Sequence, residues 1–311
     1  MGERSKVQHR TAGLRRMEAI EPGRILFRDP LSIDVDLDGI RRVDMHCHTN
    51  HSDAPVSVSD ALREARMKGI GIAITDHNQV SGCIQAVKDS SRTMVIPGIE
   101  VSALDGPHIL IYFYKTGDLQ EFYRTSIEKK KQKSPYLAIR ASTSEILDQA
   151  SGYPCICSAA HPYGYLLFNK GIGRCVEKEY LPERLISRFD ALEVISGGMQ
   201  RYQNLRAMQL AGAYGLGITG GSDAHLLRDY GRVLTYAPSD NVEEFLDAVT
   251  HHRNFVIGEE KNLLDKCLMS ALITPQYLPY LIPSIVIHYE QNIPRVKRFF
   301  MRNPESKEHK P

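Results

Sequence analysis

The feature that most constrains this chain is a series of short apolar runs that each end on, or begin with, a histidine or an acidic residue. The first run, residues 43–45, leads into His46-Cys47-His48, and Asp53 follows five residues later. Successive side chains of a strand point to opposite faces, so the two imidazoles point to the same side. This arrangement aims two nitrogen ligands at one metal ion.

The same pattern recurs along the chain. Residues 70–74, 94–99, 155–160 and 216–219 are apolar runs that lead into ligand-type side chains, and a histidine opens the run 109–113. In parallel α/β proteins the carboxyl ends of the strands gather the functional groups. A single histidine or acid in a loop is usually solvated, so the recurrence carries the inference. The candidate metal ligands are His46, His48, Asp53, His77, Glu100, His108, His161, Asp223 and His225.

Between these runs lie stretches with helical patterns. The stretch Ser57-Val58-Ser59 is placed to cap a helix over residues 60–68 that ends at Gly69, and further helices are predicted over residues 119–133, 143–150, 202–214 and 242–249. Alternating strands and helices favour βαβ units and a parallel sheet. The sequence therefore predicts an α/β fold.

These motifs resemble those of the PHP (polymerase and histidinol phosphatase) family of metal-dependent phosphoesterases. The segments that carry the resemblance read V-D-M-H-C-H-T-N-H-S-D, I-A-I-T-D-H, I-P-G-I-E-V-S, H-I-L-I-Y-F, A-A-H-P and T-G-G-S-D-A-H, in the family's order. The resemblance implies a distorted (β/α)7 barrel of PHP type, with two or three divalent metal ions at the carboxyl-end face, and hydrolysis of phosphate esters.

The resemblance also implies how the ligands are shared. One ion would be held by His46, His48, Glu100 and Asp223; Glu100 would bridge to a second, held by His108 and His161; a third would be held by Asp53, His77 and His225. Catalytic roles are expected for Glu100, Asp223 and His225. Glu100 is the predicted bridge, at the end of a strand that we expect to lie beside the His46 strand. Mixed imidazole and carboxylate ligands suit Mn, Fe or Zn better than Mg.

Four further side chains are candidates for substrate binding: His51, Arg174, Arg201 and Asn204. Each could instead be an ordinary surface residue. Asp76 precedes a candidate ligand, and it either orients an imidazole or caps a turn.

We expect a metal-dependent phosphoric ester hydrolase that cleaves a small phosphomonoester or a nucleotide phosphate with metal-activated water. Two alternatives stay open: a 5′-3′ exonuclease on short RNA or DNA oligonucleotides, and a non-catalytic metal-binding scaffold. The stretch 115–154 is shorter than the insertion of family members that act on nucleotide 3′-phosphates or RNA. The net charge of +2 is too small to indicate a dedicated nucleic-acid binder, so no stable nucleic-acid complex is expected.

Three regions are predicted: an N-terminal arm over 1–39, a barrel over 40–257 with a short helical insertion near 115–154, and a helical extension over 258–311. The extension contains an apolar run, residues 267–289, in which Pro275, Pro279 and Pro283 argue against one continuous spanning helix. We expect a broken helical tail that packs on the barrel or, in a homo-oligomer, on a second subunit, in preference to a membrane-surface anchor. Six scattered cysteines and the absence of a signal peptide indicate a cytoplasmic protein.

Overall fold

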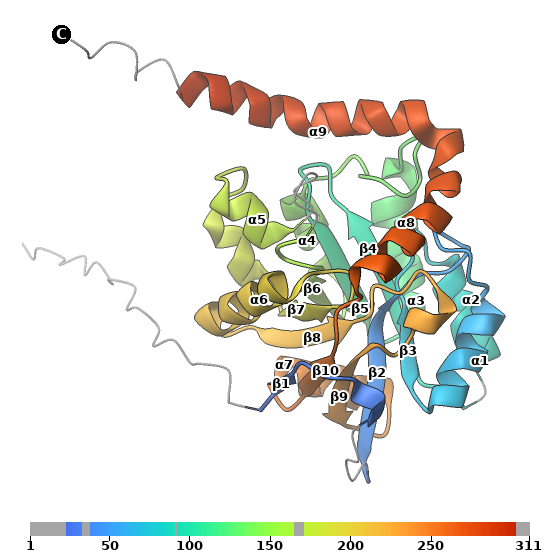
Figure 1. Cartoon of the computed structure of the whole chain (residues 1–311). Coiled ribbons are helices and arrows are strands. Elements are labelled where there is room, and N and C mark those ends of the chain that lie inside the picture. The colour runs from blue at the N-terminus through green and yellow to red at the C-terminus, as the bar shows by residue number, and fades with distance from the viewer. Residues whose placement is uncertain (1–22, 33–37, 91, 165–170, 303–311) are drawn as a thin grey trace, which may run out of the picture.

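The computed structural model describes residues 23–32, 38–90, 92–164 and 171–302, so most of the predicted N-terminal arm lies outside the described residues (Figure 1). One curled sheet organises the fold, with the strand order β1-β10-β9-β2-β3-β4-β5-β6-β7-β8. The strands are β1 (Ile25–Leu26), β2 (Ile40–Cys47), β3 (Gly71–Ile74), β4 (Val95–Ser102), β5 (His108–Phe113), β6 (Cys155–Ala159), β7 (Ala191–Ser196), β8 (Gly217–Gly221), β9 (Val233–Pro238) and β10 (Phe255–Gly258).

The direction of the strands explains where the functional groups gather. The pairs β2–β3, β3–β4, β6–β7 and β7–β8 are parallel, whereas β5 runs antiparallel to both β4 and β6. Because β5 is reversed, its first residue, His108, pairs with Ser102 near the carboxyl end of β4. The sheet therefore brings a strand beginning and several strand ends to the same edge.

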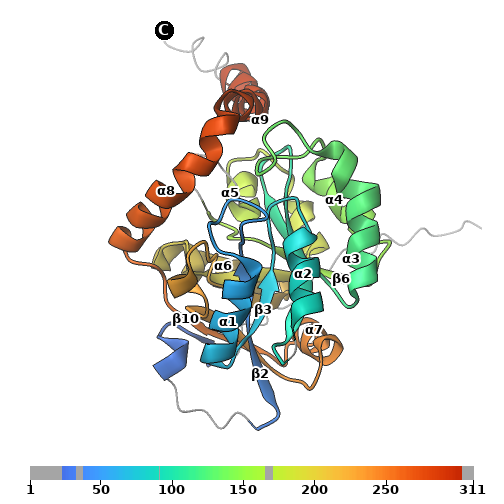
Figure 2. The ribbon, with the colours of Figure 1, turned by 90° about the vertical axis from the view of Figure 1, so that its right-hand side faces the viewer.

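Helices on the outside of the sheet complete the fold (Figures 1 and 2). The barrel helices are α1 (Val58–Lys68), α2 (Ser81–Asp89), α3 (Thr116–Phe122), α4 (Thr143–Ala150), α5 (Ile172–Glu177), α6 (Arg201–Tyr214) and α7 (Val242–Thr250). Ser57 caps α1 by accepting from the Asp60 amide, so the helix begins two residues earlier than predicted, and Gly69 ends it in the left-handed conformation, as predicted. The helix predicted over 119–133 differs, because α3 begins at Thr116, continues through a π turn and a 3-10 turn, and ends at Lys130.

Two apolar clusters form the core of the fold. The larger cluster joins strand residues such as Ile72, Ile99 and Ile111 to the helices. A second cluster packs residues of β2 to β7 against Phe245 and Leu246 of α7. Burial of these side chains supplies the main favourable free energy of folding. The predicted class, an α/β fold with a distorted barrel and a helical C-terminal extension, is confirmed.

Side chains join the two ends of the curled sheet. The Thr235 hydroxyl of β9 accepts from the Gly220 amide at 2.9 Å and donates to the Gly220 carbonyl at 3.0 Å. The Asp44 carboxylate of β2 accepts from the Ser222 amide at 2.9 Å. These bonds hold the strand that carries His46 against the strand that leads to the last ligand-type motif.

The C-terminal extension consists of α8 (Leu263–Tyr277), a 3-10 turn (Leu278–Tyr280) and α9 (Leu281–Arg302). The prolines therefore break the tail once, at 278–280. Pro275 is accommodated inside α8, and Pro283 lies in the first turn of α9, where its missing N–H has no intrahelical partner to lose. By length and composition alone, the segment Leu263–Ile293 is apolar enough to cross a membrane.

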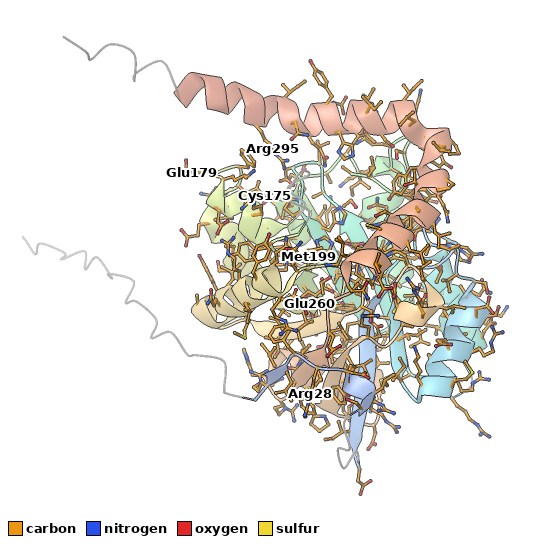
Figure 3. The ribbon with its side chains drawn as sticks, in the orientation of Figure 1. Arg28, Cys175, Glu179, Met199, Glu260 and Arg295 are labelled. Carbon is orange, nitrogen blue, oxygen red and sulfur yellow. The ribbon has the colours of Figure 1, made fainter. Side chains whose placement is uncertain are left out.

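One face of α9 contacts the barrel. Ser284 shares a hydrogen bond with Ser134 at 3.0 Å, and Ile287 packs against Leu137. Arg295 points from α9 toward Cys175 of α5 and donates to the Asp105 carbonyl at 2.7 Å (Figure 3). The opposite side of the tail exposes large apolar side chains, namely Leu278, Leu281, Ile282, Ile285, Val286 and Tyr289.

Candidate metal centre

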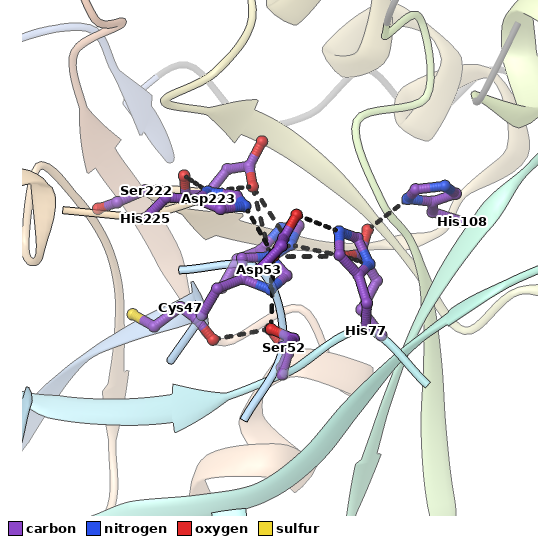
Figure 4. A network of polar contacts seen from close by, with 12 residues as sticks. Cys47, Ser52, Asp53, His77, His108, Ser222, Asp223 and His225 are labelled. Carbon is purple, nitrogen blue, oxygen red and sulfur yellow. Dashed lines mark hydrogen bonds and ion pairs between the residues drawn. The ribbon is translucent and has the colours of Figure 1, made fainter. Parts of the chain in front are cut away.

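The H-x-H motif at the end of β2 forms the centre of the site. His46 and His48 are fully buried, and their Nε2 atoms lie 3.1 Å apart. The Nδ1–H of His46 donates to Glu193 of β7 at 2.9 Å, so Nε2 is the ring nitrogen that faces His48. Cys47 lies between them and points away from the cluster (Figure 4).

Glu100 lies among five of the six candidate histidines. Its Oε1 atom lies 2.8 Å from His108 Nδ1 and 3.2 Å from His161 Nε2. Its Oε2 atom lies 2.8 Å from His77 Nδ1, and 3.4 Å from the Nε2 atoms of both His46 and His48. The two oxygens of this carboxylate therefore face different sets of imidazoles.

The position of Glu100 in the sheet differs from the prediction in two ways. It lies within β4, which runs on to Ser102 because the pairing with β5 extends the strand. In addition, β3 lies between β2 and β4, so the Glu100 strand is not the neighbour of the His46 strand. Glu100 reaches both histidines because the sheet is strongly curled.

Asp53 joins the outer part of the site. Its Oδ1 atom lies 3.3 Å from His225 Nε2 and 4.0 Å from His48 Nδ1, and its Oδ2 atom lies 3.7 Å from His77 Nε2. Figure 4 shows Asp53 between His225 and His77. Ligand atoms of these four residues lie within 4.8 Å of one another.

Two candidate ligands have unusual backbone conformations. His161 has a φ of 29° and Asp223 a φ of 47°, a region that non-glycine residues rarely adopt. Such strained residues concentrate at functional sites, where surrounding contacts hold them. The Glu193 carboxylate accepts from the His161 amide at 2.7 Å, and the buried Lys261 donates to the Asp223 carbonyl at 2.6 Å.

The three candidate carboxylate ligands are held in the charged state. Burial opposes the ionisation of Glu100, but the surrounding imidazoles, His77 foremost, hold its pKa well below the usual value. The same balance of burial against neighbouring imidazoles holds the pKa of Asp53 and of Asp223 well below the usual range. Charged carboxylates are the form that binds a cation.

The histidines divide into two groups. Burial lowers the pKa of His48 to about 3, with the neighbouring His225 adding to the effect. Burial also opposes protonation of His46 and His225, but nearby carboxylates, chiefly Glu193 and Asp53 respectively, raise the pKa of both imidazoles. Each proton on these two rings would have to leave before the ring could bind a metal.

The residues fit divalent metal ions. The Nε2 atoms of His46 and His48 lie 3.1 Å apart, while His46 Nδ1 faces Glu193. Two nitrogens each about 2.0–2.1 Å from one ion would be separated by about 3.0–3.4 Å, the spacing of neighbouring ligands. His48 Nδ1 is also buried without a hydrogen-bond partner. Ligand atoms also gather in the groups His46, His48 and Asp223, and His77, Glu100 and His108.

Some residues of the site are not in the predicted set. Glu193, Lys261 and Tyr277 each contact a candidate ligand or its backbone, and Tyr277 donates to Asp53 Oδ2 at 2.7 Å. The one signal that could have identified Glu193 is an acidic residue inside an apolar strand. Lys261 and Tyr277 have no such signal, because they come from the C-terminal part of the chain.

The candidate substrate residues have other partners. His51 contacts Ser81 and Gln85, and Arg174 lies in α5, 3.8 Å from Glu177. Arg201 pairs with Glu260 at 2.8 Å, and Asn204 bonds both the amide and the carbonyl of Ser196. None of the four is among the described residues that line the pocket at the site.

Asp76 stabilises a loop and does not orient an imidazole. Its carboxylate accepts from the amide and the hydroxyl of Thr49 and from the Ser52 hydroxyl, each at 2.7 Å. These bonds shape the loop between His48 and Asp53.

A pocket of about 280 Å³ opens onto the cluster. Six candidate ligands line one side of it: Asp53, His77, His108, His161, Asp223 and His225. Residues of α8 line the other side. The geometry therefore defines a class, namely an α/β barrel with a candidate divalent-metal centre at the ends of its strands.

Comparisons with known proteins agree with this class. Residues 201–254 match a family model described as PHP-associated. No curated protein matches the chain. A two-domain protein of Bacteroides vulgatus, containing a predicted PHP-like metal-dependent phosphoesterase, has a similar structure, with 17% identity and a TM-score of 0.53 over 72% of this chain and 67% of that chain.

Two other solved structures are similar. PsfC from Pseudomonas syringae has 16% identity and a TM-score of 0.53 over 77% of this chain and 99% of that chain. The lesion-specific endonuclease PfuEndoQ from Pyrococcus furiosus has 16% identity and a TM-score of 0.54 over 70% of this chain and 57% of that chain. The matched segment is described as PHP-associated, and these neighbours share the fold of the chain, in agreement with the resemblance seen in the motifs.

Proposed function

We propose that this protein is a metal-dependent phosphoesterase that hydrolyses a small phosphomonoester or a nucleotide phosphate with metal-activated water. The observation that carries the proposal is the convergence of nine ligand-type side chains, Glu100 among them, six of which line one pocket. Divalent ions bound there, with Mn, Fe or Zn preferred, would supply an activated water and neutralise charge on the phosphoryl group.

We propose the following distribution of ligands. His46, His48, Glu100 and Asp223 hold one ion, Glu100 bridges to an ion held by His108 and His161, and Asp53, His77 and His225 hold another. The contacts of the two Glu100 oxygens support the bridge, although His77 is close enough to Glu100 to be shared between groups. His225 donates from Nδ1 to the Asp223 carbonyl at 3.1 Å, which turns its Nε2 toward Asp53.

The volume of the pocket supports a small substrate. At about 280 Å³ it lies near the lower limit of ligand pockets, which span about 300–1,000 Å³. The side formed by α8 also narrows the approach to the candidate ligands. A phosphomonoester with a compact organic group fits this space better than a nucleic-acid duplex does.

A nuclease is the second candidate, because a nuclease shares the fold. Endonuclease Q in complex with a 27-mer duplex substrate, with an abasic lesion at the active site, has 16% identity and a TM-score of 0.53 over 68% of this chain and 57% of that chain. Short oligonucleotides therefore belong in the substrate panel, together with phosphomonoesters.

The test is turnover by metal-loaded protein. Separate preparations with Mn, Fe, Zn and Mg would be incubated with phosphomonoesters, nucleotides and short RNA and DNA oligonucleotides. We expect phosphate release from a monoester, abolished in His46→Ala and retained in His251→Ala, which changes an exposed histidine at the end of α7. If wild-type protein with bound metal shows no turnover above the His46→Ala background for any substrate, the non-catalytic scaffold replaces the enzyme.

A further inference from the structure

Helix α8 forms one wall of the candidate active site. Five of its residues line the pocket opposite the metal ligands: Met269, Ser270, Ile273, Thr274 and Tyr277. Their spacing of one, three and four residues places them on one face of the helix. Leu268 and Leu272 lie on its outer surface and are exposed.

Contacts at both ends of this wall join it to candidate metal ligands. At one end, Tyr277 donates to Asp53 Oδ2, while Asp53 Oδ1 faces His225 at 3.3 Å. The tyrosine and a metal ion would therefore use different oxygens of Asp53. At the other end, Lys261 contacts both the Met269 sulfur at 3.4 Å and the Asp223 carbonyl.

The Tyr277 ring is held in place by a second aromatic ring. Tyr136 packs edge-on against it, with the ring centroids 5.4 Å apart and the planes at 70°. Tyr136 makes a similar contact with Tyr280 of the 3-10 turn, at 5.6 Å. These contacts order the end of α8 before any ligand binds, which lowers the entropic cost of binding.

We propose that Met269, Ile273 and Tyr277 form a subsite for a flat or apolar group on the alcohol side of a phosphate ester. This inference rests on the proposed function, because it requires the phosphate to lie at the metal ligands. The side chains of these residues are a thioether, a branched alkyl chain and an aromatic ring, which make favourable apolar contacts with an aromatic or nucleobase ring. A polyol would lose its hydration there without gaining hydrogen bonds from them.

The size of the pocket permits such a substrate. A cavity of about 150 Å³ can hold a benzene ring. The pocket of about 280 Å³ therefore has room for one ring and a phosphate group. The substrate class is an aryl or nucleoside phosphate, in preference to a sugar or polyol phosphate.

Binding of stable phosphonates tests the subsite without relying on turnover. Calorimetry on zinc-loaded protein would compare phenylphosphonate with methylphosphonate, which share the charged group and differ in the ring. We expect phenylphosphonate to bind at least about tenfold more tightly, because even a small apolar group in such a pocket is worth about that factor. Ile273→Ala should remove most of this preference and leave the affinity for methylphosphonate unchanged.

Matched variants make the result specific. Leu272→Ala removes an exposed leucine from the outer face of the same helix and should change neither affinity. Tyr277→Phe keeps the ring and should keep the preference. Equal binding of the two phosphonates by wild-type protein, or equal effects of Leu272→Ala and Ile273→Ala, would overturn the subsite. Turnover in the substrate panel judges the proposed function independently, because an enzyme without ring preference would still release phosphate.

Discussion

Replacement of Glu100 by glutamine is the most direct perturbation of the proposed centre. The side chain is fully buried, and its two oxygens face five imidazoles, with the shortest contacts to His77 and His108 at 2.8 Å each. Glutamine keeps the shape and removes the negative charge. A bridging ligand touches two ions, so its loss should release or displace both.

The size of the effect follows from electrostatics. Two unit charges 4 Å apart interact by about 4 kcal/mol at an effective dielectric constant of about 20. A divalent ion has twice the unit charge and lies closer than about 4 Å to its ligand, so removal of the Glu100 charge should cost at least this much of its binding free energy. Each ~1.4 kcal/mol is a tenfold change in affinity. We therefore expect metal affinity to fall by about a thousandfold or more, and activity by several orders of magnitude. The fold should survive, because barrel stability rests mainly on the apolar layers of the strands.

Metal content per chain is the deciding measurement. Wild-type and Glu100→Gln proteins would be loaded, dialysed and submitted to elemental analysis, with circular dichroism as the check on folding. Glu243→Gln, which makes the same chemical change at an exposed position in the first turn of α7, is the control. A folded Glu100→Gln protein that keeps its full metal complement and most of its activity would refute the bridge and the assignment of the centre.

Three further predictions concern the surroundings of the ligands. Glu193→Gln should weaken metal binding or activity by about 10–100-fold, because it removes the charged hydrogen-bond acceptor of the His46 ring. An unchanged metal titration would contradict this role. Because carboxylates raise the pKa of His46 and His225, each stays protonated to a higher pH than usual, so metal affinity should rise with pH through the neutral range. Calorimetry in two buffers of different ionisation enthalpy should detect the released protons. Lys261→Met should lower the free energy of unfolding in urea by about 3–5 kcal/mol, because it leaves the buried Asp229 without the cation that lies 3.4 Å from it. A decrease in this free energy of less than about 1 kcal/mol would refute the prediction.

The sequence predicted the barrel correctly, and the nine ligand-type side chains that it singled out lie close together in the structure, for a local reason. Alternation along a strand makes His46 and His48 share a face, and the apolar runs mark the strands whose ends carry the other candidates. The start of α1 after Ser57 and its end at Gly69 were predictable for the same reason, because caps depend on a few neighbouring residues.

Predictions that required the direction or order of strands were less successful. The reversal of β5 and the insertion of β3 between β2 and β4 depend on pairing between strands, and no residue of β4 alone specifies its neighbours. The four candidate substrate residues stay predictions, and the fold gives them protein partners that the sequence did not indicate. Arg201, for example, has a basic side chain suited to a phosphate, but the fold places Glu260 within 2.8 Å of it.

By itself, the sequence predicted which side chains could bind a metal, because residue type and spacing of two along a strand are local properties. Only the tertiary structure decided what surrounds them. Tyr277 and Asp53 are separated by 224 positions, and Glu193 and His46 by 147, yet each pair is joined by a hydrogen bond. The wall that α8 adds to the pocket arises in the same way, since contacts between distant segments depend on how the whole chain packs its apolar surfaces.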